Sequence, residues 1–459
     1  MKTIQLSHFI PHDKQGQYLL LPFDMPVMTE KVAISYHYKQ HKHEQHQLDR
    51  GSFTSSEKIN TIDIGLIAPD GEQVGASGSA YQQIFVSETE ASPGYQPYPL
   101  RTGTWKILLG AYKIAPEGVE VSLEIRFDQK QMRWLKGYLH LHSLNSDGIL
   151  SLEHLGKHAR AHGLDFIAIT DHNQSVRRAS FPKIEGLTII PGQEWTHYLG
   201  HSNFFGVEKA YQGSYYANNE EEARQKFAQA RENGALISIN HPLESQVGFR
   251  YDLAKLDYDL IEVWNGPIRP RNLETIAWWD DMLKAGKKQV AVCGSDYHQD
   301  TVFQRLANPC INLLSWSNSE ADLLEAVKQG RSYFTYSPTD LHAEIWVPKD
   351  GEALSQTQAG DLAEAAAAPA NGAATFGDSV SWREGLTANL EVVGLEKGDE
   401  LRLIDQDSQQ LLFTAASQGK LSLQLPIVKP GYIRLEIWRN FFSILPILPA
   451  LVSTPIWFD

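Results

Sequence analysis

The stretch Gly137-Tyr-Leu-His-Leu-His-Ser-Leu-Asn-Ser-Asp-Gly148 decides how the rest of the chain is interpreted. It places His140 and His142 two residues apart and Asp147 five residues further on. In an extended strand, residues i and i+2 point to the same side, so the two imidazoles can bind one metal ion. Asp147, in the loop that follows, can reach the same pocket. A single His-x-His is a weak signal, so the prediction depends on whether the arrangement recurs.

Alternating strands and helices are predicted from about residue 133 to residue 345. The strand at 137–142 is followed by a helix from Ser151, a good N-cap, to Gly163, a good helix-terminating residue. The next strand, 164–170, is almost entirely apolar, as expected for a parallel strand that is covered on both faces. This pattern predicts an α/β fold, a (β/α) barrel with fewer than eight regular units.

Metal-ligand residue types follow five of the predicted strands. They are His140, His142 and Asp147 after the first strand, His172 after the second, Glu194 and His201 after the third, His241 after the fourth, and Asp296 and His298 after the last; we call them the nine candidate ligands. Barrel enzymes place their active sites at this end of the strands. Six histidines and three carboxylates at one rim would be costly without cations to bind them.

A mixture of imidazole and carboxylate ligands indicates Zn, Mn or Fe rather than Mg or Ca. Nine ligands exceed the needs of one tetrahedral site, so we expect two or three ions with a carboxylate as bridge. Two adjacent ions can clamp the attacking and leaving oxygens of a hydrolytic reaction. His154, His158 and His162 lie on the predicted helix after Ser151, and we expect them to be surface or packing residues.

The motifs resemble those of the polymerase and histidinol phosphatase (PHP) family, and within it the CehA/McbA-type metallohydrolases. The resemblance covers about residues 134–340 and rests on His140-Leu-His142-Ser, Ser146-Asp147-Gly148, Thr170-Asp171-His172-Asn173, Glu194-Trp-Thr, Gly200-His-Ser-Asn, His241 and Asp296-Tyr-His298. It implies a distorted (β/α)7 barrel that binds two or three Zn, Mn or Fe ions.

The resemblance also implies how the ligands divide. One metal is held by His140, His142, Glu194 and Asp296; Glu194 bridges to a second held by His201 and His241; and Asp147, His172 and His298 hold a third. The catalytic candidates are Glu194, His298 and Asp171. Either His298 or a metal-bound water would donate a proton to the leaving oxygen, and Asp171 would orient its neighbours. The candidates for substrate contact are His197, Asn173, Arg177 and Arg269.

The barrel is expected between two β-rich regions. Residues 1–132 read as a β-sandwich or jelly roll, residues 346–380 as an Ala-rich flexible linker or insertion, and residues 381–459 as a C-terminal β module. Four histidines of the first region, His37, His41, His43 and His46, lie in a polar tract. We expect a solvated loop there, with no strand or helix to fix a metal site.

Composition excludes several functions. The formal net charge is −14, which disfavours binding to a nucleic-acid backbone. Cys293 and Cys310, the only cysteines, read as reduced buried thiols. The N-terminus does not resemble a signal peptide, and the longest apolar stretch, 441–452, is too short to span a membrane. These features predict a cytoplasmic location without membrane association.

The predicted function is a metal-dependent phosphoesterase that hydrolyses a phosphomonoester or phosphodiester by a metal-bridging hydroxide. The expected partner is a small anionic substrate. One alternative is a carbamate or carboxyl ester hydrolase of the CehA/McbA type. Another is a carbohydrate- or surface-binding protein with a degenerate barrel, although such a site would be expected to lose ligands. The substrate, the native metal and the oligomeric state stay open.

Overall fold

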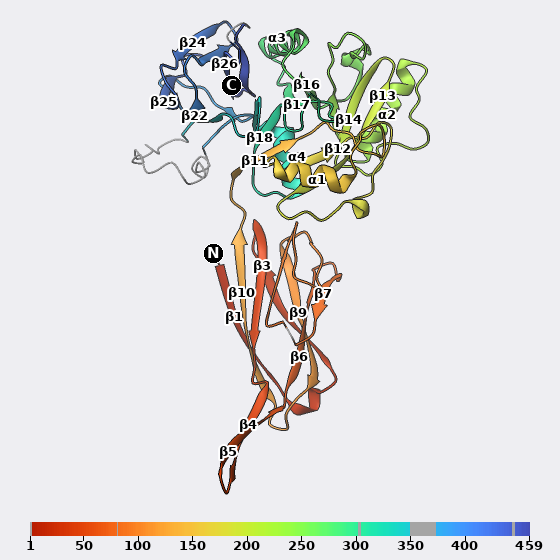
Figure 1. The fold of residues 1–459 in the computed structure, drawn as a ribbon, viewed down its shortest axis with the longest axis vertical. Coiled ribbons are helices and arrows are strands. Elements are labelled where there is room, and N and C mark those ends of the chain that lie inside the picture. The colour runs from red at the N-terminus through yellow and green to blue at the C-terminus, as the bar shows by residue number, and fades with distance from the viewer. Residues whose placement is uncertain (1, 80, 302–303, 349–372, 443–445) are drawn as a thin grey trace. The chain divides into compact units, whose positions relative to one another are not determined.

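The computed structural model describes residues 2–79, 81–301, 304–348, 373–442 and 446–459 (Figure 1). The chain divides into two compact units, Met1–Gln131 and Met132–Asp459. Most of the predicted linker, residues 349–372, lies outside the described residues. At its ends, Val347 pairs with Ala374, and Phe376 is buried. No helix among the described residues has the length and apolarity needed to span a membrane.

The first unit contains two four-stranded antiparallel sheets. One has the order β1 (Lys2–Ile10), β10 (Val119–Gln129), β3 (Thr29–His37), β8 (Gln83–Ser87), and the other β2 (Tyr18–Met25), β9 (Gly103–Lys113), β6 (Thr61–Ile67), β7 (Gln73–Ser77). Buried and exposed residues alternate along β10, as they do in a sheet with one face toward a core. The buried faces share one hydrophobic core that includes Tyr36, Trp105 and Phe127.

The polar tract with the histidines forms a β-hairpin, so the expectation of a loop is wrong. Strands β4 (His41–Leu48) and β5 (Gly51–Lys58) pair antiparallel over their whole length, and most of their residues are exposed (Figure 1). Gly51 at the turn has a φ of 115°, which a side chain disfavours. The ring of His46 stacks on that of Phe53 at 4.8 Å. Cross-strand pairing therefore holds a segment that has no apolar core face.

The second unit is built on one large mixed sheet. Its first strands are β11 (Arg133–Tyr138), β12 (Phe166–Ile169), β13 (Thr188–His197), β14 (Gly200–Phe205), β15 (Leu236–Ile239), β16 (Leu260–Asn265) and β17 (Val290–Gly294), which neighbour one another in chain order. Beyond β17, Tyr297 forms a parallel bridge with Leu141. The Tyr297 carbonyl accepts from the His142 N–H at 2.8 Å, which joins the last strand's end back to that of the first.

The mixed α/β class is confirmed, but the alternation of strand and helix is irregular. The described residues contain four α-helices, α1 (Leu152–Ala161), α2 (Glu220–Glu232), α3 (Pro270–Lys284) and α4 (Glu320–Gln329), and three short 3-10 helices, η1 (His12–Lys14), η2 (Arg178–Ser180) and η3 (Leu253–Lys255). No α-helix separates β12 from β13, and β13 and β14 form an antiparallel hairpin. The tight turn before Gly200, with φ 139°, leaves no room for a helix.

Most of the C-terminal strands extend the same sheet. Next to β11 come β18 (Cys310–Ser315) and β19 (Ser332–Thr335), and β19 pairs with β27 (Leu448–Ser453). The remaining strands are β20 (His342–Trp346), β21 (Ser379–Val380), β22 (Thr387–Leu395), β23 (Glu400–Asp405), β24 (Gln409–Thr414), β25 (Gly419–Pro426), β26 (Gly431–Arg439) and β28 (Ile456–Phe458). Of these, β20, β22 and β25 form a separate three-stranded antiparallel sheet. Arg434 of β26 is buried and contacts Asp280 of α3 at 3.0 Å. The C-terminal β-rich segment is thus continuous with the mixed sheet.

Candidate metal centre

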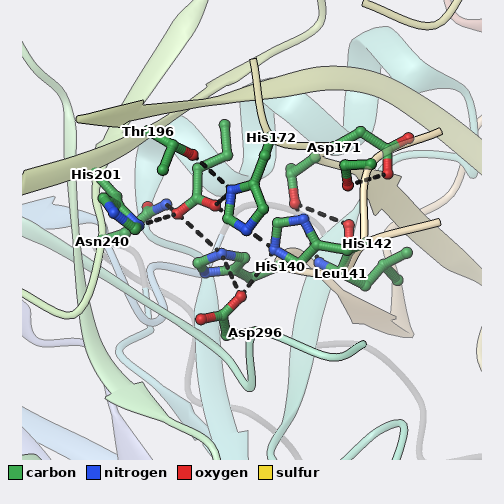
Figure 2. A network of polar contacts seen from close by, with 12 residues as sticks. His140, Leu141, His142, Asp171, His172, Thr196, His201, Asn240 and Asp296 are labelled. Atoms are coloured by element: carbon green, nitrogen blue, oxygen red, sulfur yellow. Dashed lines mark hydrogen bonds and ion pairs between the residues drawn. The ribbon is translucent and has the colours of Figure 1, made fainter. Parts of the chain in front are cut away.

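The structure brings the nine candidate ligands together at one end of the strands. His140 and His142 follow β11, His172 follows β12, Glu194 and His201 lie on the hairpin of β13 and β14, His241 follows β15, and Asp296 and His298 follow β17. Figure 2 shows His140, His142, His172, His201 and Asp296 converging from these separate segments. Asp147 approaches from the loop between β11 and α1.

Glu194 lies at the middle of the cluster. Its Oε1 is 3.3 Å from His140 Nε2, 3.2 Å from His201 Nδ1 and 3.7 Å from His241 Nε2. Its Oε2 is 2.7 Å from His172 Nδ1 and 3.5 Å from His142 Nε2. One fully buried carboxylate therefore contacts five imidazoles, a position from which it can serve two ions.

Two further carboxylates complete the cluster. Asp296 Oδ1 is 2.8 Å from His142 Nε2 and 3.4 Å from His140 Nε2. Asp147 Oδ1 is 3.2 Å from His298 Nε2 and 3.6 Å from the Nε2 of His172.

Potential ligand atoms form three groups. The groups are His140, His142, Glu194 and Asp296; Glu194, His201 and His241; and His142, Asp147, His172 and His298. His142 belongs to two of them, whereas the family resemblance places it in the first alone. Its ring stacks against those of His172 and His298, each at 4.2 Å, so it connects the first group to the third.

Burial differs strongly across the cluster. Glu194, His140, His142 and His241 are buried, whereas the side chain of Asp147 is 58% exposed. The side chains of His298 and Asp296 are about one quarter exposed. The cluster is therefore open to solvent on the side of Asp147 and His298.

Mutual electrostatics perturb these groups. Burial raises the pKa of Glu194, but the His140 imidazole and the other neighbouring histidines outweigh burial and hold that pKa well below its usual range. Burial lowers the pKa of His140, and the carboxylates of Glu262, Glu194 and Asp296 reverse this and raise it well above the usual value. Burial lowers the pKa of His142, which favours the neutral imidazole that a metal requires.

The residues fit divalent metal ions. Buried nitrogen atoms of His140 (Nε2), His201 (Nδ1) and His241 (both) and the Oε2 of Glu194 have no hydrogen-bond partner. Buried polar atoms are normally paired, because an unpaired one costs about 1–3 kcal/mol. In the part of the chain that the structure describes, no lysine or arginine forms an ion pair with the three carboxylates of the cluster. Cations at the centre would bind the unpaired nitrogen and oxygen atoms and would balance the negative charge of the carboxylates.

Asp171 contacts the loop next to the cluster. Its Oδ1 accepts from the Ser143 N–H at 2.6 Å and the Ser146 hydroxyl at 2.9 Å, and its Oδ2 accepts from the Ser143 hydroxyl at 2.7 Å. Figure 2 shows Asp171 beside His142. It is fully buried and fixes the turn between His142 and Asp147.

The four candidates for substrate contact have other partners or lie exposed. Both ring nitrogens of His197 are engaged, Nε2 by the Ala217 carbonyl and Nδ1 by the Tyr251 hydroxyl, each at 2.8 Å. The Asn173 side chain donates to the Thr196 carbonyl and accepts from the Thr196 main-chain N–H, each at 3.0 Å.

The arginine candidates do not contact the cluster in the described residues. Arg269 pairs with Glu244 at 3.3 Å, and Arg177 is exposed at the start of η2. Two neighbouring arginines, Arg178 and Arg271, form ion pairs with Glu320 and Glu274.

Three residues that support the cluster were not predicted. Asn240 Nδ2 donates to Glu194 Oε1 at 2.8 Å, and the Thr196 hydroxyl is 2.5 Å from His172 Nδ1. Glu262 of β16 is 2.9 Å from His140 Nδ1. The only sequence signal for Glu262 is an acidic residue within an otherwise apolar strand, which normally requires a partner.

The backbone at the site is unusual. His241 and Asp296 have positive φ angles of 28° and 55°, and that of Asn173 is 50°. Such conformations are uncommon for residues with side chains and cluster at functional sites. The strain supports a functional role for these strand ends.

Comparisons with known proteins give weak likenesses. No family model matches the chain, and no curated protein does. A two-domain protein from Bacteroides vulgatus containing a predicted PHP-like metal-dependent phosphoesterase is 17% identical, over 72% of this chain and 99% of that chain, with a TM-score of 0.38.

Two further solved structures match shorter parts. A putative metal-dependent phosphoesterase from Bifidobacterium adolescentis is 14% identical over 36% of this chain and 87% of that chain, with a TM-score of 0.26. An amidohydrolase from Chromobacterium violaceum is 16% identical over 35% of this chain and 87% of that chain, with a TM-score of 0.24. At these values the likenesses carry no argument about function, which therefore rests on the site.

Proposed function

We propose that the chain is a metal-dependent hydrolase of the PHP type, whose strands β11 to β17 form a distorted seven-stranded barrel. The observation that carries the proposal is the convergence of nine candidate ligands on Glu194, with buried nitrogens left without hydrogen bonds. Two or three divalent transition-metal ions, Zn, Mn or Fe, suit this donor set. The ions would be held by the three groups described above.

Bound ions would supply positive charge that stabilises a transition state and lowers the pKa of water. The chain's own residues hold and orient the reactants. Glu194 joins the two deepest groups, and Asp171 fixes the turn that carries Asp147. The Nδ1–H of His298 donates to the Asp296 carbonyl at 2.7 Å, which directs Nε2 toward Asp147. On this open side, His298 would either help to hold the third ion through Nε2 or, where that nitrogen binds no ion, deliver a proton to a leaving oxygen.

Phosphoester hydrolysis is the reaction that the three groups support best. A phosphoryl group carries up to two negative charges and several oxygens, so a third cation has a charge to neutralise. The third group, with Asp147, is also the exposed one, where a small anionic substrate can enter. We propose a phosphomonoester or phosphodiester as the substrate.

One observation favours a carbamate or carboxyl ester instead. Phosphate sites usually contain arginine or lysine, yet the Arg269 guanidinium pairs with Glu244, and no lysine or arginine forms an ion pair with the cluster's carboxylates within the described ranges. A neutral ester would need no such side chain. Recognition of a phosphoryl group would depend on the metals alone.

The test is a substrate screen on protein reconstituted with Zn, Mn or Fe. Phosphomonoesters, phosphodiesters, aryl esters and aryl carbamates are compared by kcat/KM, with inorganic phosphate as a competitor. The proposal expects phosphoesters to be preferred and phosphate to inhibit competitively. A strong preference for carbamates without phosphate inhibition would establish the alternative. The absence of any metal-dependent hydrolysis would overturn both.

A further inference from the structure

Glu262 is a buried carboxylate that touches two parts of the cluster at once. Its Oε1 is 2.9 Å from His140 Nδ1. Its Oε2 accepts from the His241 main-chain N–H at 3.0 Å and from the Asn265 amide at 2.9 Å. The residue is 2% exposed, so water does not replace these partners.

The local backbone aims this side chain across the sheet. The register of β16 against β17 shifts between Glu262 and Trp264, and such bulges redirect side chains beside active sites. Between β16 and His140 lies Gly294 of β17. A Cβ on Gly294 would stand 2.6 Å from Glu262 Oε1 and 2.4 Å from His140 Cβ. The contact therefore requires both a bulge and a glycine.

The chemistry of the contact fixes the state of His140. An ionised carboxylate can only accept hydrogen bonds, so the hydrogen lies on His140 Nδ1. In the neutral ring, the lone pair is then on Nε2, which faces Glu194 at 3.3 Å and Asp296 at 3.4 Å. Histidine ligands commonly carry such a carboxylate on the other nitrogen.

The second contact acts on a strained segment. His241 has a φ of 28°, and its N–H is the group that Glu262 Oε2 holds. The same carboxylate thus orients the His140 ring and restrains the backbone that carries the His241 ring. We propose that Glu262 is a positioning residue that sets the ligand geometry of two metal groups together. This inference rests on the proposed metal centre.

The variant Glu262→Gln tests the inference, because the amide keeps the shape but cannot accept at both ends. If its NH2 group faces His140, that ring must accept at Nδ1 and carry its hydrogen on Nε2. If the NH2 group faces His241 instead, it meets the His241 main-chain N–H and the Asn265 amide, which are both donors and then have no acceptor. We expect metal affinity, measured by competition with a chelator, to fall about 10- to 100-fold.

A matched control is Glu344→Gln. Glu344 is 6% exposed and accepts from Trp134 Nε1 at 2.8 Å, with His342 Nε2 at 3.1 Å, so it is also a buried carboxylate beside a histidine. It has no contact with the nine candidate ligands in the described part of the chain. This variant should lose stability comparably but keep its metal affinity within about twofold. Equal losses of affinity in the two variants would overturn the inference.

A second readout is independent of metal binding. In the full chain labelled with 15N-histidine, the His140 Nδ1–H signal, identified by its loss in His140→Ala, should be protected from exchange in the wild type. In Glu262→Gln this signal should be lost or exchange rapidly if the amide NH2 faces His140. If the NH2 faces His241 instead, the His241 main-chain N–H loses its acceptor and should be the signal that exchanges rapidly. Protection of both signals in that variant would contradict the inference even if the wild type bound no metal. Failure of the wild type to bind Zn or Mn would instead refute the proposed function.

Should Glu262→Gln fail to fold, Asn265→Ser is the second variant. It removes the amide donor to Oε2 and leaves the carboxylate in place. A several-fold loss of metal affinity with faster exchange of the His140 Nδ1–H would support the inference. Unchanged affinity and exchange would count against it.

Discussion

Gly294 provides a sharp test of the geometry around His140. It is the last residue of β17, and a Cβ there would lie 2.4 Å from His140 Cβ, 2.6 Å from Glu262 Oε1 and 3.3 Å from the main-chain nitrogen of His140. Real Cβ atoms do not approach other atoms so closely, so Gly294→Ala must displace something. The nearest atoms cannot rotate away, because one belongs to His140 close to its backbone and the other is held by hydrogen bonds.

The expected cost is that of overpacking a buried site, about 1–3 kcal/mol of unfolding free energy. For a unit of this size, such a loss lowers Tm by roughly 2–6 °C. The displaced group is the His140 ring or its Glu262 partner, so metal affinity should fall by about 10-fold or more as well. Both effects should appear together, which distinguishes crowding at the centre from general destabilisation.

Gly419→Ala is the matched control. Gly419 begins β25, has no atom within 4 Å of an added Cβ, and does not have a positive φ in the range that disfavours side chains. This substitution should leave Tm unchanged or slightly raised and metal affinity unchanged. Calorimetry and chelator competition measure the two properties. A Gly294→Ala protein with the Tm and metal affinity of the wild type would refute the close approach of His140 and Glu262 over β17.

Three further predictions address the centre itself. Glu194→Gln should lower both metal occupancy and activity by at least about 100-fold, because Glu194 contacts five imidazoles. The control His154→Ala, on the exposed face of α1, should keep activity within a few-fold. Similar behaviour of the two variants would show that the centre is wrongly assigned. Protein purified without chelator should contain two or three transition-metal ions per chain by elemental analysis, and less than one equivalent after addition of Zn or Mn would contradict the metal centre. Asp147→Asn should impair phosphoester turnover more than aryl ester turnover, because Asp147 belongs to the third group; an equal loss on both substrates would remove the argument for phosphoesters.

The convergence of the nine candidate ligands could be predicted because it depends on local features. Each residue lies at or just after an apolar strand, and strands in chain order bring their ends to one rim. Predicting that the strand ends meet at one rim needs only the positions of the strands, and the prediction holds even for Glu194 and His201. These two lie on an antiparallel hairpin rather than on separate β/α units. They are diagonal neighbours, since His201 pairs with Thr196 and Glu194 with Asn203, yet Glu194 Oε1 lies 3.2 Å from His201 Nδ1.

Other features could not be predicted because they depend on contacts between distant segments. Glu262 reaches His140 across β17, and neither the bulge in β16 nor the need for Gly294 has a local signature. The pairing of β19 with β27 joins segments separated by more than a hundred residues, so the C-terminal strands looked like a separate module. The hairpin of β4 and β5 has no apolar alternation, which is the signal that strand prediction requires.

The contrast in burial across the cluster suggests how its groups divide the work. Glu194 and His241 lie where water is excluded, and electrostatic interactions are strong there because the dielectric constant is low. Asp147, more than half exposed, and His298 face solvent. Ions in the buried groups would therefore be held firmly, while the exposed group can admit a substrate and exchange its ligands. Because His142 stacks on both His172 and His298, it is the connection through which the buried part can position the exposed part.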